Sequence, residues 1–142
     1  MGQRVCVFGL NVFGRTVASC LTELGYSVTA IDTDEAAVEQ IKELVDCAYI
    51  IDSFQEETLR EIPGIQAADV IICAVDDFVQ SGIISFMSIN WPNKHVVIAK
   101  AVNDIHEKFL NKLGVSRVVF PERDTGVNLV LELNSLLNSG KK

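Results

Sequence analysis

The chain has 142 residues, of which 49% are hydrophobic and 22% are charged, a composition typical of one soluble globular domain and unlike disordered, collagen-like or coiled-coil chains. Twelve basic against nineteen acidic residues give a net charge of −7, the wrong sign for a protein that binds nucleic acid by neutralising phosphates. The longest apolar run, Val70 to Val75, is far shorter than the ~20 residues of a membrane-spanning helix. No leader-like segment opens the chain, so we expect a cytoplasmic protein.

Short apolar runs rich in β-branched residues alternate with helical patterns, which is typical of a parallel sheet covered by helices. Six runs are predicted strands: Arg4–Phe8, Ser27–Ile31, Ala48–Ile51, Asp69–Val75, His95–Ala99 and Arg117–Phe120. Their nearly continuous apolar character indicates burial on both faces. We therefore predict a single α/β domain over residues 1–137, a Rossmann-like doubly wound parallel sheet of six strands. Residues 138–142 are expected to form a tail or linker.

Helical stripes and cap residues place the helices between these strands. Phe13, Val17, Leu21 and Leu24 lie on one stripe of the first helix. Cap residues predict further boundaries: Gly25 after the first helix, Asp34 before the second, a Ser53-x-x-Glu56 capping box before a short third, and Asn103 before one that ends at Leu113–Gly114.

Two predicted helices, Phe78–Ile89 and Val127–Leu137, are apolar around most of their circumference. A surface helix of a small domain needs only one buried stripe, so the second apolar face predicts burial against another subunit. We expect a homodimer or a larger ring. The alternative is that these helices are central in their own domain.

A glycine-rich loop, Gly9-Leu10-Asn11-Val12-Phe13-Gly14, directly follows the first strand and opens the first helix. This is the position of the phosphate loop in a Rossmann unit. Gly9 permits the tight turn, Gly14 permits close packing of helix on strand, and the helix start favours a phosphate. Asn11 stands in place of the middle glycine. We expect the turn to survive, with weaker or altered phosphate binding, because asparagine tolerates a left-handed backbone.

Asp32 ends the second strand, eighteen residues after Gly14. A carboxylate at this position accepts hydrogen bonds from both ribose hydroxyls and repels a 2′-phosphate. The spacing therefore predicts NAD(H), ATP, ADP or AMP as ligands in preference to NADP. The alternative is that Asp32 only ends a strand and begins a turn with Thr33 and Asp34.

Other polar residues follow the remaining strands and gather at the carboxyl edge of the predicted sheet, where ligands bind in open α/β folds. They are Asp52 and Ser53, Asp76 and Asp77, Lys100, and Pro121-Glu122-Arg123-Asp124. Ser53, Asp77 and Asp124 have the alternative role of helix caps.

The sequence predicts neither catalytic nor metal-ligating residues. The four cysteines and two histidines lack the spacing of zinc ligands, and Cys6 and Cys73 lie in strand-like runs where a thiol behaves as a small hydrophobe. No Ser-His-Asp or Cys-His arrangement and no P-loop lysine are suggested.

Five segments together resemble the TrkA-N domain, also called RCK or KTN, of regulatory subunits of Trk and Ktr potassium transporters: Val7–Gly14, Ala30–Asp34, Ala68–Ile71, Ile98–Ala101 and Val119–Gly126. The resemblance runs from about Arg4 to Leu137. It implies a non-catalytic cytoplasmic sensor, peripheral at the inner face of the cell membrane. Such a sensor binds adenine nucleotides, forms dimers and rings, and signals to a membrane-embedded potassium-transporting subunit.

Carried over by position, the resemblance also implies roles for individual residues. These are a phosphate loop of Gly9, Asn11, Val12, Phe13 and Gly14; ribose binding by Asp32, next to Thr33; an adenine position flanked by Asp52 and Ser53; a phosphate or nicotinamide side bordered by Ala74, Val75 and Lys100; and Glu122 near a terminal phosphate or a cation.

The chain departs from the family pattern in its glycine loop. The family loop usually reads Gly-x-Gly-Arg-Phe-Gly, so Asn11 replaces a glycine and Val12 replaces a basic residue. Family subunits also commonly continue into a C-terminal domain. Two other functions stay open: a small NAD-dependent oxidoreductase, and a degenerate Rossmann scaffold that oligomerises but has lost nucleotide binding.

Overall fold

A computed structural model describes residues 3–92 and 96–140. Its strands are β1 (Arg4–Phe8), β2 (Ser27–Asp32), β3 (Cys47–Ile50), β4 (Val70–Cys73), β5 (Val96–Lys100) and β6 (Arg117–Val119). They form one sheet in the order β3-β2-β1-β4-β5-β6, and every pair is parallel. The predicted doubly wound sheet is confirmed, with strand ends within two residues of the expected ones. The expected start of the fifth strand, His95, lies outside the described residues.

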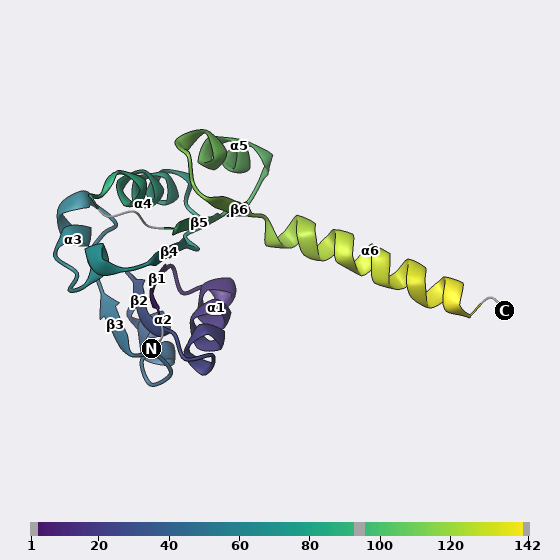
Figure 1. Cartoon of the computed structure of the whole chain (residues 1–142), viewed down its shortest axis with the longest axis horizontal. Helices are drawn as coiled ribbons and strands as arrows, with labels where there is room; N and C mark the ends of the chain where they lie inside the picture. The colour runs from purple at the N-terminus through teal and green to yellow at the C-terminus, as the bar shows by residue number, and fades with distance from the viewer. Residues whose placement is uncertain (1–2, 93–95, 141–142) are drawn as a thin grey trace.

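Helices cover both faces of the sheet (Figure 1). α1 (Val12–Glu23) and α2 (Glu35–Ile41) pack on one face; α3 (Glu56–Arg60), a short 3-10 turn (Ile65–Ala67), α4 (Phe78–Asn90) and α5 (Asp104–Leu113) pack on the other. Alternate residues of each strand supply the two cores, because successive side chains point to opposite faces. In β1, Val5 and Val7 join the α1 side, while Cys6 and Phe8 join the α4 side.

Most predicted caps are confirmed. Gly25 and Gly114 have φ of 96° and 94°, and the side chains of Asp34 and Asn103 accept backbone N–H groups of α2 and α5. The predicted capping box at Ser53 is wrong: α3 begins after Gln55, which makes no side-chain cap. Phe54 is buried, with its ring edge-on to Phe8 at 6.3 Å between centroids. Burial of this ring fixes the segment before the helix and overrides the local capping signal.

The final helix, α6 (Pro121–Ser139), begins six residues earlier than the predicted apolar helix and includes Asn138 and Ser139 of the expected tail. It projects away from the sheet in Figure 1, and none of its described residues is buried. Apolar side chains more than half exposed occur along its length: Val127, Leu129, Val130, Leu131, Leu133, Leu136 and Leu137. An isolated helix of this composition leaves a large apolar surface without a covering partner.

The second predicted two-faced helix, α4, does pack on the sheet. Ile84 and Met87 are buried in the core, whereas Val79 and Phe86 on another face are 65% and 56% exposed. Met87 therefore does not share the exposed face of Val79 and Phe86. No described helix is both long and apolar enough to cross a membrane.

Two of the cysteines belong to the core. Cys6 and Cys73 are buried, and burial raises the pKa of the Cys6 thiol to about 12 and that of Cys73 to about 11. Both are neutral thiols at physiological pH, as expected for cysteine that acts as a small hydrophobe.

Candidate functional site

The glycine loop connects β1 to α1, and two of its residues cannot carry a side chain. Gly9 has φ of 92°, and a Cβ atom there would lie 2.8 Å from the backbone nitrogen of Val75. A Cβ atom on Gly14 would lie 1.8 Å from the carbonyl oxygen of Gly9. The first glycine therefore makes the turn and the second lets α1 pack directly against it, as the sequence predicts.

Asn11 is the N-cap of α1, with an extended backbone at φ −68° and ψ −177°. The expectation that this position relies on a left-handed asparagine is wrong, because the backbone turn is made at Gly9 instead. The side chain of Asn11 accepts a hydrogen bond from the N–H of Gly14 at 2.9 Å through Oδ1. Its Nδ2 donates to the carbonyl oxygen of Ala74 at 2.7 Å and to Oδ2 of Asp76 at 3.4 Å.

Asp32 joins the end of β2 to the glycine loop. Its Oδ2 accepts the N–H of Leu10 at 2.6 Å, and its Oδ1 accepts the N–H groups of Thr33 at 2.6 Å and Asp34 at 3.0 Å. The hydroxyl of Thr33 also lies 3.5 Å from Oδ1, so four protein donors face a carboxylate that has about four acceptor sites, and this long contact is the one that a ribose hydroxyl would replace. The turn-forming role of Asp32 and its predicted ribose-binding role are thus compatible.

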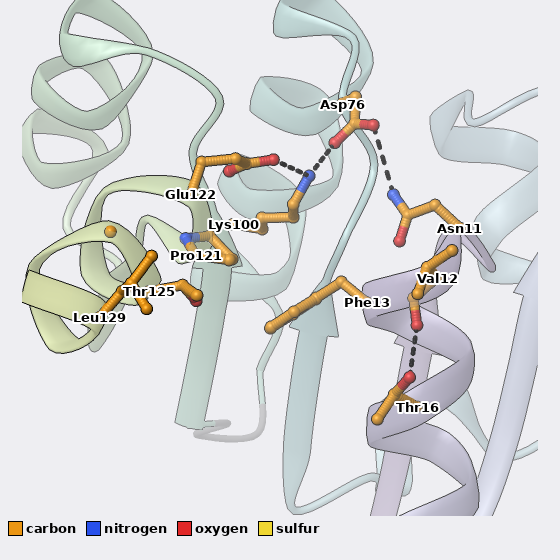
Figure 2. Close-up of a pocket in the computed structure, with 11 residues that line it drawn as sticks. Asn11, Val12, Phe13, Thr16, Asp76, Lys100, Pro121, Glu122, Thr125 and Leu129 are labelled. Carbon is orange, nitrogen blue, oxygen red and sulfur yellow. Dashed lines mark hydrogen bonds and ion pairs between the residues drawn. The ribbon is translucent and has the colours of Figure 1, made fainter. Parts of the chain in front are cut away.

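A cavity of about 800 Å³ opens beside this loop, at the carboxyl edge of the sheet. It lies where the strand order reverses between β1 and β4, the position at which open α/β sheets bind ligands. Three parts of the chain line it: the start of α1 with Asn11, Val12, Phe13 and Thr16; the ends of β4 and β5 with Asp76 and Lys100; and one face of α6 with Pro121, Glu122, Thr125, Gly126 and Leu129 (Figure 2).

Lys100 supplies the positive charge of the cavity. Its side chain is 7% exposed, and its Nζ lies 2.5 Å from Oδ1 of Asp76 and 4.0 Å from Oε1 of Glu122. Figure 2 shows these side chains converging at the cavity, with Asn11 pointing to the other oxygen of Asp76. A chain of polar contacts therefore runs from the start of α1 to the first turn of α6. A buried ammonium at this edge is suited to an anionic ligand.

The structure separates the remaining predicted residues from the cavity lining. The packing contacts of the glycine loop involve Gly9, Gly14, Ala74 and Val75. Asp32 contacts the loop at the N–H of Leu10, and Thr33 contacts Asp32. Asp52 lines a separate hollow of about 250 Å³ beyond β3, and Ser53 is half-buried outside both. The ligand-binding roles of all these residues stay predictions.

Of the α6 wall, the sequence predicts a ligand role for Glu122 alone, because the apolar run places the start of this helix at Val127 and not at Pro121. Pro121 occupies the first position of α6, and Glu122 and Asp124 follow in its first turn. Proline at the first helical position followed by acidic residues is a start signal, so the sequence did contain the evidence for an earlier start. Asp76 was noted at a strand end, but its pairing with Lys100 depends on packing between distant segments.

A second ion pair holds the base of α6 against α5. Arg123 donates from Nη1 and Nη2 to the two carboxylate oxygens of Glu107 at 2.9 and 2.7 Å, and its guanidinium lies 4.7 Å from the centre of the Phe120 ring. Hydrogen bonding from Arg123 lowers the pKa of Glu107. This two-point contact fixes the first turn of α6, and with it the position of Glu122 beside the cavity.

Three comparisons with known proteins show the family and the fold of this chain. The family model of the TrkA-N domain matches residues 5–121. Ktr system potassium uptake protein C of Bacillus subtilis (strain 168) is 35% identical over 124 residues, which are 87% of this chain and 56% of that protein. The chain thus spans little more than half the length of this relative.

Two solved structures share the fold. The TrkA-N domain of inner membrane protein ybaL from Escherichia coli superposes with a TM-score of 0.80 and 20% identity, covering 94% of this chain and 97% of that one. The Kef CTD of Shewanella denitrificans in AMP bound form gives a TM-score of 0.77 and 23% identity, covering 95% and 82%. At these identities the likeness shows the fold. Because the family match extends over most of the sequence, the chain belongs to the TrkA-N domain family.

Proposed function

We propose that this chain is a nucleotide-binding regulatory domain of a potassium transport system. The observation that carries the proposal is the cavity at the reversal point of the sheet, whose walls include both the glycine loop and α6. A ligand in this cavity touches a fixed part of the sheet and the base of a projecting helix at once. The similarity to a potassium uptake protein supports the biological context.

The proposed ligand is an adenine nucleotide: NAD(H), ATP, ADP or AMP. The start of α1 offers backbone N–H groups to a phosphate, Lys100 offers a buried ammonium, and Asp32 offers a carboxylate whose long contact with the Thr33 hydroxyl a ribose hydroxyl would replace. The AMP-bound Kef domain shows that a protein of this fold binds an adenine nucleotide. We expect NADP to be disfavoured, because a 2′-phosphate would meet the Asp32 carboxylate.

The proposed mechanism is regulatory rather than catalytic. A ligand shifts an equilibrium only through its different affinity for two states, and the cavity wall formed by α6 provides a surface that changes when α6 moves. The exposed apolar residues of α6 are proposed to pack against a second copy in a homodimer or larger ring. Ligand state would then alter the arrangement of subunits and so act on a membrane-embedded potassium-transporting partner, at the inner face of the membrane.

Calorimetric titration of nucleotide-stripped protein with NAD, NADH, ATP, ADP, AMP and NADP tests this function. We expect saturable binding of at least one adenine nucleotide and much weaker binding of NADP. Absence of binding by all six would favour the degenerate scaffold instead. Steady turnover of a nicotinamide cofactor with small alcohols or carbonyl compounds would favour an oxidoreductase.

A further inference from the structure

We propose that the Asn11 side chain competes with the phosphate of the ligand, and that this residue sets the affinity of the pocket for phosphate-bearing nucleotides. The inference rests on the proposed nucleotide-binding function. It concerns the residue that replaces the middle glycine of the phosphate loop.

The first step is the hydrogen bond between Asn11 and Gly14. The first-turn N–H groups of a helix have no intrahelical acceptor, and these are the donors that a phosphate uses at a helix start. In α1 the carbonyl oxygen of the Asn11 amide already accepts the N–H of Gly14 at 2.9 Å. A phosphate oxygen and the Asn11 amide cannot both take this donor at good geometry, so one must replace the other.

The second step is that Nδ2 of Asn11 spans the gap between the loop after β1 and the residues after β4. Nδ2 of Asn11 donates to the carbonyl oxygen of Ala74 at 2.7 Å and to Asp76 at 3.4 Å, which ties the loop after β1 to the residues after β4. Asn11 also lines the cavity, as Figure 2 shows. The amide thus lies between the ends of β1 and β4, where a bound diphosphate would cross. A ligand there must break the contacts of both Oδ1 and Nδ2 of Asn11.

A glycine at this position would leave the N–H of Gly14, and the gap between the ends of β1 and β4, free for a phosphate. The replacement of Asn11 by glycine therefore should strengthen binding of ligands that carry a phosphate, and leave adenosine unchanged. An aspartate keeps the cap acceptor but loses the donor to Ala74 and Asp76 and adds a negative charge, so it should weaken phosphate binding.

The chain contains a matched control for the loss of an asparagine cap. Asn103 is the N-cap of α5, and its Oδ1 accepts the N–H of His106 at 2.8 Å, the same position in the helix as Gly14 in α1. Asn103→Gly removes an equivalent cap outside the cavity lining. Replacing an asparagine cap by glycine has a small effect on helix stability, so both variants should fold.

The experiment is calorimetric titration of ADP, AMP and adenosine into wild type, Asn11→Gly, Asn11→Asp and Asn103→Gly. We expect Asn11→Gly to bind ADP and AMP about three- to tenfold more tightly, Asn11→Asp to bind them more weakly, and Asn103→Gly to match wild type. Binding by Asn11→Gly where wild type does not bind would support the competition by Asn11 and contradict the proposed function of the wild-type chain.

Wild-type binding with no gain in Asn11→Gly, or an equal gain in Asn103→Gly, would overturn the inference and leave the proposed function intact. If no variant binds any nucleotide, the proposed function fails and the inference fails with it.

Discussion

The carboxylate of Asp32 accepts the backbone N–H of Leu10 at 2.6 Å, across the gap between the end of β2 and the glycine loop. The same carboxylate accepts the N–H groups of Thr33 and Asp34, so it shapes two turns. The loop geometry and the proposed ribose contact therefore involve the same side chain.

Asp32→Ala is expected to weaken every adenosine-containing ligand and also to destabilise the fold. Three backbone N–H groups lose their acceptor, which for a charged acceptor costs ~1–3 kcal/mol of unfolding free energy. Calorimetry and denaturant unfolding measure the two effects. Asp34→Ala is the control. It removes the side chain that caps α2 by accepting the N–H of Ala36, but it leaves the contact between Asp32 and Leu10 in place. Unchanged nucleotide affinity in Asp32→Ala would refute the assignment of Asp32 to the ribose.

Lys100 is expected to recognise phosphate rather than the adenosine part of the ligand. Lys100→Met removes the buried ammonium between Asp76 and Glu122 and leaves two carboxylates at the cavity, so phosphate-bearing nucleotides should bind at least about tenfold more weakly. Binding of adenosine should change little. Lys112→Met, at an exposed site near the end of α5, is the matched control. Equal losses for ADP and adenosine would place Lys100 outside the phosphate site.

His106 is expected to make the fold less stable in mild acid. It is buried, its Nδ1 accepts the N–H of Val102 at 3.2 Å, and its Nε2 lies 3.0 Å from the hydroxyl of Ser81, which assigns the proton to Nε2. Burial lowers its pKa from 6.5, with the Lys100 ammonium adding to this effect and the carboxylate of Asp76 opposing it. The structure thus holds the neutral ring between α4 and α5.

The direction of the pH effect follows from that shift. Below pH 6.5 the unfolded chain binds a proton at His106 that the folded chain does not, so unfolding free energy is greatest above this pH and falls as pH decreases. Melting temperatures from pH 7.5 to 5.5 should therefore decline, and less so in His106→Gln. An NMR titration of the His106 ring in the wild type gives the folded pKa directly. A value above 6.5 would contradict the prediction.

Local patterns account for the elements that the sequence predicted correctly. The apolar runs of the six strands, the positive φ at Gly9 and the cap at Asn103 each depend on a few adjacent residues, so spacing and residue type were sufficient. Where a contact between distant residues competes with a local pattern, the prediction from the local pattern is wrong. Burial of Phe54 against Phe8 displaced the start of α3 from the predicted Ser53 box.

The candidate site was predictable only in part for the same reason. Asn11, Val12 and Phe13 were found because they lie inside one loop motif, and Lys100 and Glu122 because they follow strands. The pairing of Lys100 with Asp76 joins residues 24 positions apart. The side wall formed by Leu129 depends on the direction in which α6 leaves the sheet, which no spacing rule gives.

The exposed apolar surface of α6 is expected to mediate self-association. Val130 and Leu137 are seven residues apart on one face of the helix and are 64% and 61% exposed. We expect wild type to be a dimer or larger by light scattering. The pair Val130→Asp and Leu137→Asp should reduce the mass, because carboxylates at a covered apolar contact are costly to bury.

Leu44→Asp controls for a general effect of added charge, since Leu44 is 53% exposed near the end of α2, far along the chain from α6. It should keep the wild-type mass. A wild-type mass equal to one chain would contradict self-association. An α6 variant that keeps the wild-type mass would show that α6 is not the contact. Because Leu129 of the same helix lines the cavity, self-association through α6 also predicts that nucleotide affinity differs between the assembled and dissociated states.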